Sequence, residues 1–330
     1  MDSSHLKEFL AGRGEPAFRA DQVREWLARG ATGYGEMTNL PAGLREELER
    51  EVPISTLTVT RTATSDDGTV KALFETVDRR PLEAVLMRYR DGRRSICLSS
   101  QSGCPLTCTF CATGTMQFGR NLTGDEIVDQ ALHFRRIEPI DHAVFMGMGE
   151  PMMNLDAVFE ACERLPEVGI ANSKTTVSTV GWLPGIERMA NEGPTVRLAL
   201  SLHAPEDALR SEIMPVNDRY PIAELIEACL EWRSKRKRKV FIEYLMLEGV
   251  NDSPDQARQL AALLGTGHDF KVNLIPFNPS GTGYTGSSRE AIEAFRKALV
   301  GAGVHATVRL TRGRDIDAAC GQLAVRESVA

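Results

Sequence analysis

Residues 94–111 read RSICLSSQSGCPLTCTFC, and this stretch decides how the rest of the chain is interpreted. An apolar strand leads into three cysteines, Cys104, Cys108 and Cys111, which are spaced C-x3-C-x2-C. Three thiolates this close together can hold one metal centre. A [4Fe–4S] cluster usually takes four cysteines, so three would leave one iron open for a substrate or cofactor. The alternative is a structural zinc loop, whose fourth ligand is not apparent nearby because the next histidine, His133, lies in a predicted helix.

Beyond this stretch, predicted strands alternate with predicted helices, which is typical of βαβ units around a parallel sheet. The strands are expected at residues 94–99, 142–146, 174–179, 196–202, 239–246, 270–275 and 304–309. The helices are expected near residues 123–137, 155–165, 184–192, 221–234, 253–264 and 288–301. Six or seven units over about 215 residues are fewer than the eight of a closed barrel. We therefore predict an α/β fold with a partial barrel, whose functional residues lie at the carboxyl ends of the strands.

These patterns divide the chain into four segments. Residues 1–55 carry apolar positions at helical spacing and predict a small helical N-terminal domain. Residues 56–92 alternate or run apolar between Asp-Gly turns, which predicts a short β extension. Residues 93–310 form the partial barrel, and residues 311–330 form a C-terminal tail with weak periodicity.

The composition limits the class of protein. The 330 residues include 39 Lys and Arg against 45 Asp and Glu, a net charge of −6, so binding to nucleic acid would need a local basic patch. Seven cysteines in a long chain argue against a secreted disulfide framework. Neither a signal peptide nor a transmembrane helix is apparent. We expect a cytoplasmic protein without membrane contact, in which clustered cysteines bind metal or take part in catalysis.

Polar residues and glycines close several of the predicted strands. Gly147, Gly149 and Glu150 follow the strand at 142–146, and glycines at a strand end let the backbone approach a ligand closely. Ser178, the segment 201–203 and Asn278 end three further strands. By position alone, each of these could face a site, cap the next helix or form a turn.

Two of the remaining cysteines lie outside any helical core pattern. Cys97 ends the first barrel strand, and Cys320 lies in the irregular tail RGRDIDAACGQL, residues 312–323. By contrast, Cys162 and Cys229 fall on apolar helical faces and are predicted core residues. From the residues alone, Cys97 and Cys320 would be interpreted as buried or incidental thiols.

Four separated blocks, taken with the cluster spacing, change that interpretation. They are CLSSQSGC at 97–104, MGMGEP at 146–151, SLHAP at 201–205 and DIDAACGQL at 315–323. Over most of its length the chain resembles the RlmN/Cfr family of radical S-adenosylmethionine (SAM) RNA methyltransferases. The resemblance implies a partial (β/α)6 barrel with a helical accessory domain, in agreement with the strand pattern.

The resemblance also implies the cofactors. A [4Fe–4S] cluster would be held by Cys104, Cys108 and Cys111, with SAM on its open iron. Two SAM molecules would be used per turnover. The implied SAM contacts are Gly149, Glu150, Ser178, Ser201, Leu202, His203 and Asn278.

The implied chemistry explains the two further cysteines. Adenine C2 lies between two ring nitrogens and is a poor nucleophile, so family members methylate it by a radical route. The resemblance implies that one SAM molecule methylates Cys320 and that a second SAM molecule yields the radical that activates the S-methyl group. Glu83 removes the ring proton from the resulting RNA adduct, and Cys97 releases the product by forming a transient disulfide. A mobile tail would suit Cys320.

The family divides between adenine C2 and C8. Pro151 and Glu243 resemble the C2 branch, whereas residues 214–221 are closer to the C8 branch. We favour a C2 enzyme that acts on 23S ribosomal RNA and transfer RNA. The alternatives are a C8 methyltransferase of 23S ribosomal RNA and a non-catalytic iron–sulfur protein that binds nucleic acid.

Local basic groups are the candidate RNA contacts. Residues 233–239 read RSKRKRK, which is either a solvated helix end or a phosphate-binding run. Arg93 and Arg94, with Arg309, Arg312 and Arg314, are expected to add positive charge around the site. The remaining implied partner is a reductant such as flavodoxin or ferredoxin, and we expect a monomer.

Overall fold

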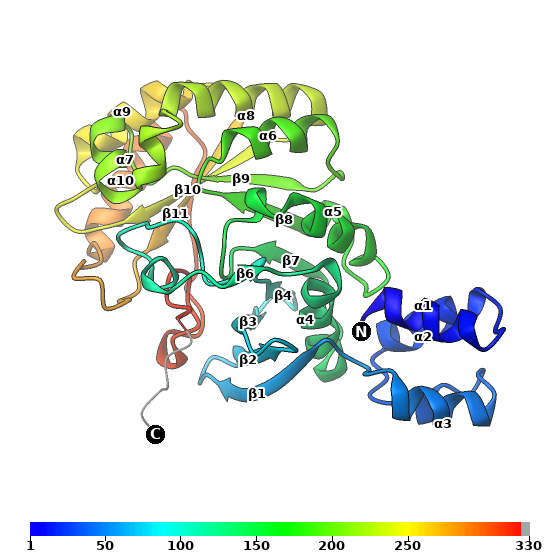
Figure 1. Ribbon diagram of the computed structural model, residues 1–330. Coiled ribbons are helices and arrows are strands. Elements are labelled where there is room, and N and C mark those ends of the chain that lie inside the picture. Colours follow the sequence, from blue (N-terminus) through cyan, green and yellow to red (C-terminus); the bar gives the residue numbers. More distant parts are fainter. Residues whose placement is uncertain (325–330) are drawn as a thin grey trace.

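The structure, a computed structural model, describes residues 1–324 and is dominated by one large sheet (Figure 1). Within these residues the strand order is β1-β2-β3-β4-β7-β8-β9-β10-β11-β12. The strands are β1 (Leu57–Thr64), β2 (Val70–Thr76), β3 (Pro81–Arg88), β4 (Arg94–Cys97), β7 (His142–Phe145), β8 (Thr175–Thr179), β9 (Arg197–Ser201), β10 (Val240–Met246), β11 (Phe270–Pro276) and β12 (Ala306–Val308). A separate short pair joins β5 (Gln101–Ser102) to β6 (Arg120–Asn121).

The sheet changes from antiparallel to parallel at β4. Cys97 at its end stands opposite Val85 of antiparallel β3 and Val144 of parallel β7. From β7 to β12 every neighbouring pair is parallel, and β1 and β12 are the two edges, so the sheet stays open. The predicted partial barrel is confirmed. The β extension is part of the same sheet, because β4 satisfies its backbone groups on both sides.

Helices cover the outer face of the parallel part, close to the predicted positions. They are α4 (Gly124–Ile137), α5 (Leu155–Arg164), α6 (Leu183–Asn191), α8 (Ile222–Arg236), α9 (Pro254–Leu264) and α10 (Arg289–Gly301). Capping boxes begin α4, at Thr123 and Glu126, and α9, at Ser253 and Gln256. The sequence did not predict α7 (Asp207–Ile213), a short helix that buries the charged Arg210. No helix within residues 1–324 is long and apolar enough to span a bilayer.

Three N-terminal helices lie outside the sheet beside α4, coloured blue in Figure 1. They are α1 (Ser3–Gly12), α2 (Phe18–Arg29) and α3 (Ala42–Glu51), with a one-turn helix η1 (Tyr34–Glu36) before α3. Their buried faces are apolar, as the helical spacing predicts. The buried Asp129 carboxylate of α4 pairs with the Met1 ammonium and accepts a hydrogen bond from the Thr56 amide at 2.6 Å. It therefore attaches the start of the helical domain and the start of the β extension to the barrel.

The C-terminal segment is more firmly attached than a mobile tail would be. Asp315, in the one-turn helix η6 (Arg314–Ile316), accepts hydrogen bonds from Ser65 and from the Asp66 amide in the β1–β2 turn. At its other end the Ala112 amide donates to the Gly321 carbonyl at 2.9 Å. The segment therefore bridges the β extension and the cysteine loop. Residues 325–330 of the predicted tail lie outside the described residues.

Candidate active site

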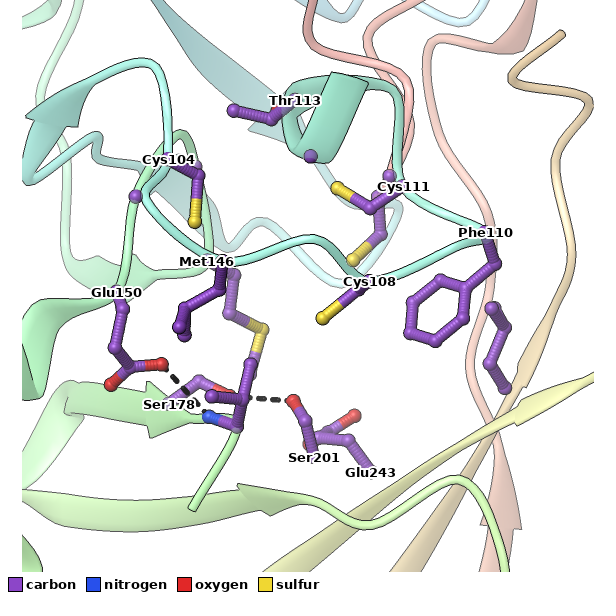
Figure 2. Close-up of a pocket in the computed structure, with 18 of the residues that line it drawn as sticks. Cys104, Cys108, Phe110, Cys111, Thr113, Met146, Glu150, Ser178, Ser201 and Glu243 are labelled. Carbon is purple, nitrogen blue, oxygen red and sulfur yellow. Dashed lines mark hydrogen bonds between the residues drawn. The ribbon is translucent and has the colours of Figure 1, made fainter. Parts of the chain in front are cut away.

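The three clustered cysteines lie on the loop between β5 and the one-turn helix η2 (Ala112–Thr115). Figure 2 shows their sulfurs turned toward a common space. Burial is the main cause that raises the pKa of Cys104 to about 12 and the pKa of Cys108 well above its usual range, and neighbouring thiols add to the shift. A cationic centre would stabilise the charged thiolate forms and so lower these pKa values. A positively charged group is therefore the kind of group that this loop would bind through thiolates.

The spacing of these thiols bears on the kind of centre. Within residues 1–324, no three His, Cys, Asp or Glu side chains are close enough to hold a single metal ion. A structural zinc site needs four ligands on one ion, so this geometry does not favour the zinc loop. Cysteines that ligate different irons of one cluster lie further apart. The three thiols fit a multi-iron cluster better than one ion.

A cavity opens beside this loop at the carboxyl ends of the parallel strands, as the partial barrel predicts. It brings together the three clustered cysteines, five of the seven implied SAM contacts and Cys320. Its lining includes Cys104, Cys108, Cys111, Gly149, Glu150, Ser178, Ser201, His203 and Cys320. Leu202 is fully buried and does not line it, and Asn278 lines a neighbouring cavity instead.

The glycine segment after β7 places a carboxylate in this cavity. Gly149 has φ +94°, and a Cβ there would lie 2.5 Å from the Gln101 side chain, so the backbone path requires glycine. The Glu150 carboxylate accepts hydrogen bonds from the amides of Met152 and Val180, both at 2.9 Å. Burial raises the pKa of Glu150 to about 7. The carboxylate keeps free acceptor capacity, which suits an ammonium group.

His203 contributes a neutral imidazole. Its Nδ1 accepts a hydrogen bond from the Leu245 amide at 3.0 Å, so the proton is on Nε2. Burial is the main cause that lowers the pKa of His203 to about 3, and Arg210 adds to it. The ring packs edge-on against Phe110, with centroids 5.0 Å apart. The side chain, which lines the cavity, is thus fixed with Nε2 as its remaining donor.

The sequence analysis did not identify Arg210, which holds the strand ends together. Its guanidinium is fully buried and donates to the carbonyls of Val180, Ser201 and Leu202. It also donates to the Asn217 side chain at 2.8 Å. A buried arginine in a short helix carries no periodicity signal, so only the structure reveals that it positions the loops after β8 and β9.

A second, smaller cavity connects the two remaining cysteines. Cys97, Asn278, Arg309 and Cys320 all line it, and Cys320 lines the cavity beside the cluster loop as well. All seven cysteines are free thiols. Cys320 therefore lies between the clustered cysteines and Cys97, within a few side chains of both.

Glu83 is buried rather than exposed on an alternating strand. Its carboxylate pairs with Lys71 at 3.1 Å and accepts a hydrogen bond from the Ala324 amide at 3.1 Å. It lines neither of the two cavities that Cys320 lines. The contact with Ala324 nevertheless connects Glu83 to the segment that carries Cys320.

The basic run at 233–239 lies at the end of the barrel opposite the site. It ends α8 and leads into the amino end of β10, whereas the cavity lies at the carboxyl ends. Arg233 pairs with Asp269 at 2.5 Å, and Arg236 donates to the Met189 carbonyl. Arg93 and Arg94 also lie at the amino end, beside β4. The expectation that Arg93 and Arg94 add positive charge around the site is wrong, because it ignored strand direction.

The tail arginines differ in position. Arg309 and Arg312 both line the cavity shared by Cys97 and Cys320. The Arg312 guanidinium, however, pairs with the Asp67 carboxylate at 3.7 Å. Arg314 is exposed. Of the predicted basic groups, Arg309 is the one placed against the candidate catalytic thiols.

Comparisons with known proteins agree with this geometry. Residues 98–261 match the family model of the radical SAM superfamily, and residues 1–54 match the ribosomal RNA large subunit methyltransferase N-terminal domain. The dual-specificity RNA methyltransferase RlmN of Geobacter sulfurreducens is 45% identical over 328 residues, covering 98% of this chain and 90% of that protein. The protein of the same name from Pelobacter propionicus is 45% identical over 323 residues, covering 96% and 92%. The crystal structure of a radical SAM methyltransferase from Sphaerobacter thermophilus matches with a TM-score of 0.92 and 44% identity, covering 98% and 97%.

Proposed function

Because the chain belongs to the RlmN family of radical SAM RNA methyltransferases, we propose that it methylates C2 of adenosine in 23S ribosomal RNA and in transfer RNA. The dual specificity is taken from the names of the relatives. Pro151 and Glu243 support C2 over C8, since both resemble the C2 branch. We place the enzyme in the cytoplasm as a monomer, reduced by a flavodoxin or ferredoxin.

Cys104, Cys108 and Cys111 would hold a [4Fe–4S] cluster, and the adjoining cavity would hold SAM. The buried Glu150 carboxylate would bind the amino group of SAM, with Gly149 providing the close backbone approach. Ser178, Ser201 and His203 would make further polar contacts, while Leu202 would contribute its packing and Asn278 would act from the neighbouring cavity. The bound cluster and SAM supply radical chemistry, and two SAM molecules are consumed per turnover.

The observation that carries the proposal is the position of Cys320 on both cavities. Facing the SAM cavity, its sulfur would accept a methyl group and later carry the one-carbon unit to the base. Facing Cys97, the same sulfur is within reach of a second thiol. A C2 carbon is unreactive toward a methyl sulfonium, so a protein-bound carrier is needed.

Glu83 would take the ring proton from the RNA adduct, and the unpaired electron of the adduct would return to the oxidised cluster that supplied it, which leaves a closed-shell thioether. Its burial and its contacts with Lys71 and Ala324 hold it beside the Cys320 segment. The Cys97 thiolate would then attack the Cys320 sulfur. An S–S bond forms as the S–CH2 bond breaks, and the electron pair leaves with the carbon, which takes up a proton to become the methyl group.

The decisive experiment is mass mapping of ribosomal and transfer RNA from cells with and without the protein. We expect 2-methyladenosine to disappear with the gene and to return with wild type but not with Cys320→Ala. Loss of 8-methyladenosine instead would establish the C8 alternative. If the protein binds RNA but reductive SAM cleavage yields no 5′-deoxyadenosine, it is the non-catalytic iron–sulfur protein.

A further inference from the structure

Arg309 follows β12 and lines the small cavity that Cys97 and Cys320 share. Its amide donates to the Leu274 carbonyl at 2.8 Å, which continues the pairing of β12 with β11. The side chain is therefore rooted in the sheet, while the thiols come from β4 and from the C-terminal segment. Three separate parts of the chain converge on this cavity.

The guanidinium is oriented by its neighbours without being used up. The Arg309 Nη1 donates a hydrogen bond to the Met146 sulfur at 3.2 Å and lies 3.9 Å from the Glu243 carboxylate. Glu243 accepts a hydrogen bond from Asn273 at 2.9 Å, and Asn273 accepts one from Thr307 at 2.8 Å. A guanidinium has five N–H donors, and within the part of the chain that the structure describes the Arg309 side chain donates one hydrogen bond, to Met146, so donors remain for the cavity.

A cation at this position matters because the thiolate, and not the thiol, is the nucleophile in sulfur exchange. The pKa of Cys97 is raised to about 12, mainly by burial and in part by neighbouring Cys320. Arg309 and the Met146 amide act in the opposite direction. Arg309 therefore increases the fraction of Cys97 thiolate at a given pH, and its removal would lower that fraction.

The other nearby cations have different partners. Lys71 pairs with Glu83 at 3.1 Å, and Arg312, on the same small cavity, faces Asp67 at 3.7 Å. The titratable groups that act on Cys97 are Cys320 from the C-terminal segment and Arg309 from the end of β12. Arg309 in turn interacts electrostatically with Glu243 of β10 and Tyr89 after β3. Among residues 1–324, Arg309 is thus the cation whose charge acts on both thiols.

We propose that Arg309 is a positioning residue for the sulfur–sulfur step, holding the Cys97 thiolate against Cys320 so that the methylated RNA is released. The inference rests on the proposed function for its place in the reaction. The geometry that supports it does not require RNA: a cation fixed by Met146 and Glu243 lies at a cavity lined by two free thiols.

The first test measures the reactivity of the Cys97 thiol in the cluster-loaded protein, without SAM or RNA. Modification by methyl methanethiosulfonate is followed between pH 7 and 10 by peptide mass spectrometry. Arg309→Gln should slow modification of Cys97 about tenfold at pH 8.5 and shift its pH profile upward by about one unit. Arg309→Lys should recover most of the rate, and Arg314→Gln, which removes an exposed arginine from the same segment, should match wild type.

Two outcomes would overturn the inference. One is an unchanged pH profile in Arg309→Gln, and the other is a loss in Arg309→Lys equal to that in Arg309→Gln, since charge would then not matter. Iron content and circular dichroism of each variant report whether it folds. Should Arg309→Gln not fold, Glu243→Gln replaces it: releasing the guanidinium from its carboxylate partner should move the Cys97 profile, and no movement refutes the inference.

The second test measures product release. Under turnover, Arg309→Gln should accumulate the protein–RNA adduct that Cys97→Ala traps, with Cys320 still methylated. If Arg309→Gln turns over without adduct while Cys97→Ala traps it, Arg309 has no part in release. If Cys97→Ala traps no adduct, the proposed function fails, whereas the modification rate of Cys97 still decides what Arg309 does to that thiol.

Discussion

At the residue scale, single atoms of backbone and side chain fix the cavity. Gly149 passes so close to Gln101 that no side chain fits, and the Gln101 Oε1 accepts the Glu150 amide at 2.8 Å. The carboxylate of Glu150 is then held by two further amides. The position of one carboxylate therefore depends on a glycine and a glutamine that contact no reacting atom.

Gly149→Ala should damage the site and the fold together. The new Cβ meets Gln101 at 2.5 Å in a backbone conformation that alanine rarely adopts, which costs about 1–3 kcal/mol of unfolding free energy. SAM affinity should fall because Glu150 shifts. Urea unfolding and equilibrium binding of SAM measure the two effects. Gly12→Ala is the control, since a Cβ at the end of α1 meets nothing within 4 Å, and equal losses in both variants would contradict the argument.

His203→Asn should flatten the dependence of stability on acid. The unfolded chain protonates this histidine near its ordinary pKa of 6.5, while the folded protein does so only near 3. Between these values the unfolded state binds more protons, so wild type loses stability as the pH falls. Asparagine keeps an acceptor for the Leu245 amide. Urea unfolding measures the free energy of unfolding at pH 7 and at pH 5. The decrease between these two pH values should be about 2 kcal/mol smaller in the variant than in wild type. An equal decrease in both proteins would refute this prediction.

At the element scale, the C-terminal segment depends on the β1–β2 turn. Asp315 accepts from Ser65 and Asp66, and the Gly313 amide donates to Asp67 at 3.1 Å. Lys71 of β2 donates to the Asp317 carbonyl at 3.2 Å. The β extension thus provides the base on which the segment with Cys320 rests, and this is a role that a domain-by-domain interpretation of the sequence does not predict.

Asp315→Ala should loosen this segment while leaving the barrel intact. Removing two hydrogen bonds, both accepted by the charged Asp315 carboxylate, costs about 1–3 kcal/mol locally. Hydrogen exchange of the amides in residues 313–322 should accelerate about tenfold or more, and the methylated fraction of Cys320 should fall. Asp255→Ala, which removes an exposed aspartate of α9 paired with Arg258, should leave both unchanged. Unaltered exchange in Asp315→Ala would show that the turn does not hold the segment.

At the scale of the whole molecule, periodicity predicted the partial barrel and the loop positions of the cysteines correctly. It could not predict where the edges of the open sheet would meet the C-terminal segment, because Ser65, Glu83 and Cys320 are far apart in the sequence. It also missed Arg210, which is buried against three carbonyls at the ends of β8 and β9. The residues around Cys320 became meaningful through resemblance, and their contacts through the structure.

Strand direction at this scale also decides which basic groups can reach the target adenosine. Parallel strands place the cavity at one end of the barrel and the run at 233–239 at the other. Replacing Lys237, Arg238 and Lys239 by glutamine should therefore leave the KM for a short anticodon stem-loop within about twofold of wild type. The salt dependence of binding should also be unchanged, since each lost phosphate contact would lower its slope by about one. Wild type and Arg309→Gln are measured in the same assay as the two reference proteins for kcat. A raised KM with a reduced salt slope in the triple variant would mean that RNA wraps from the SAM cavity to the amino end of the barrel, a path that the separation of the two ends argues against.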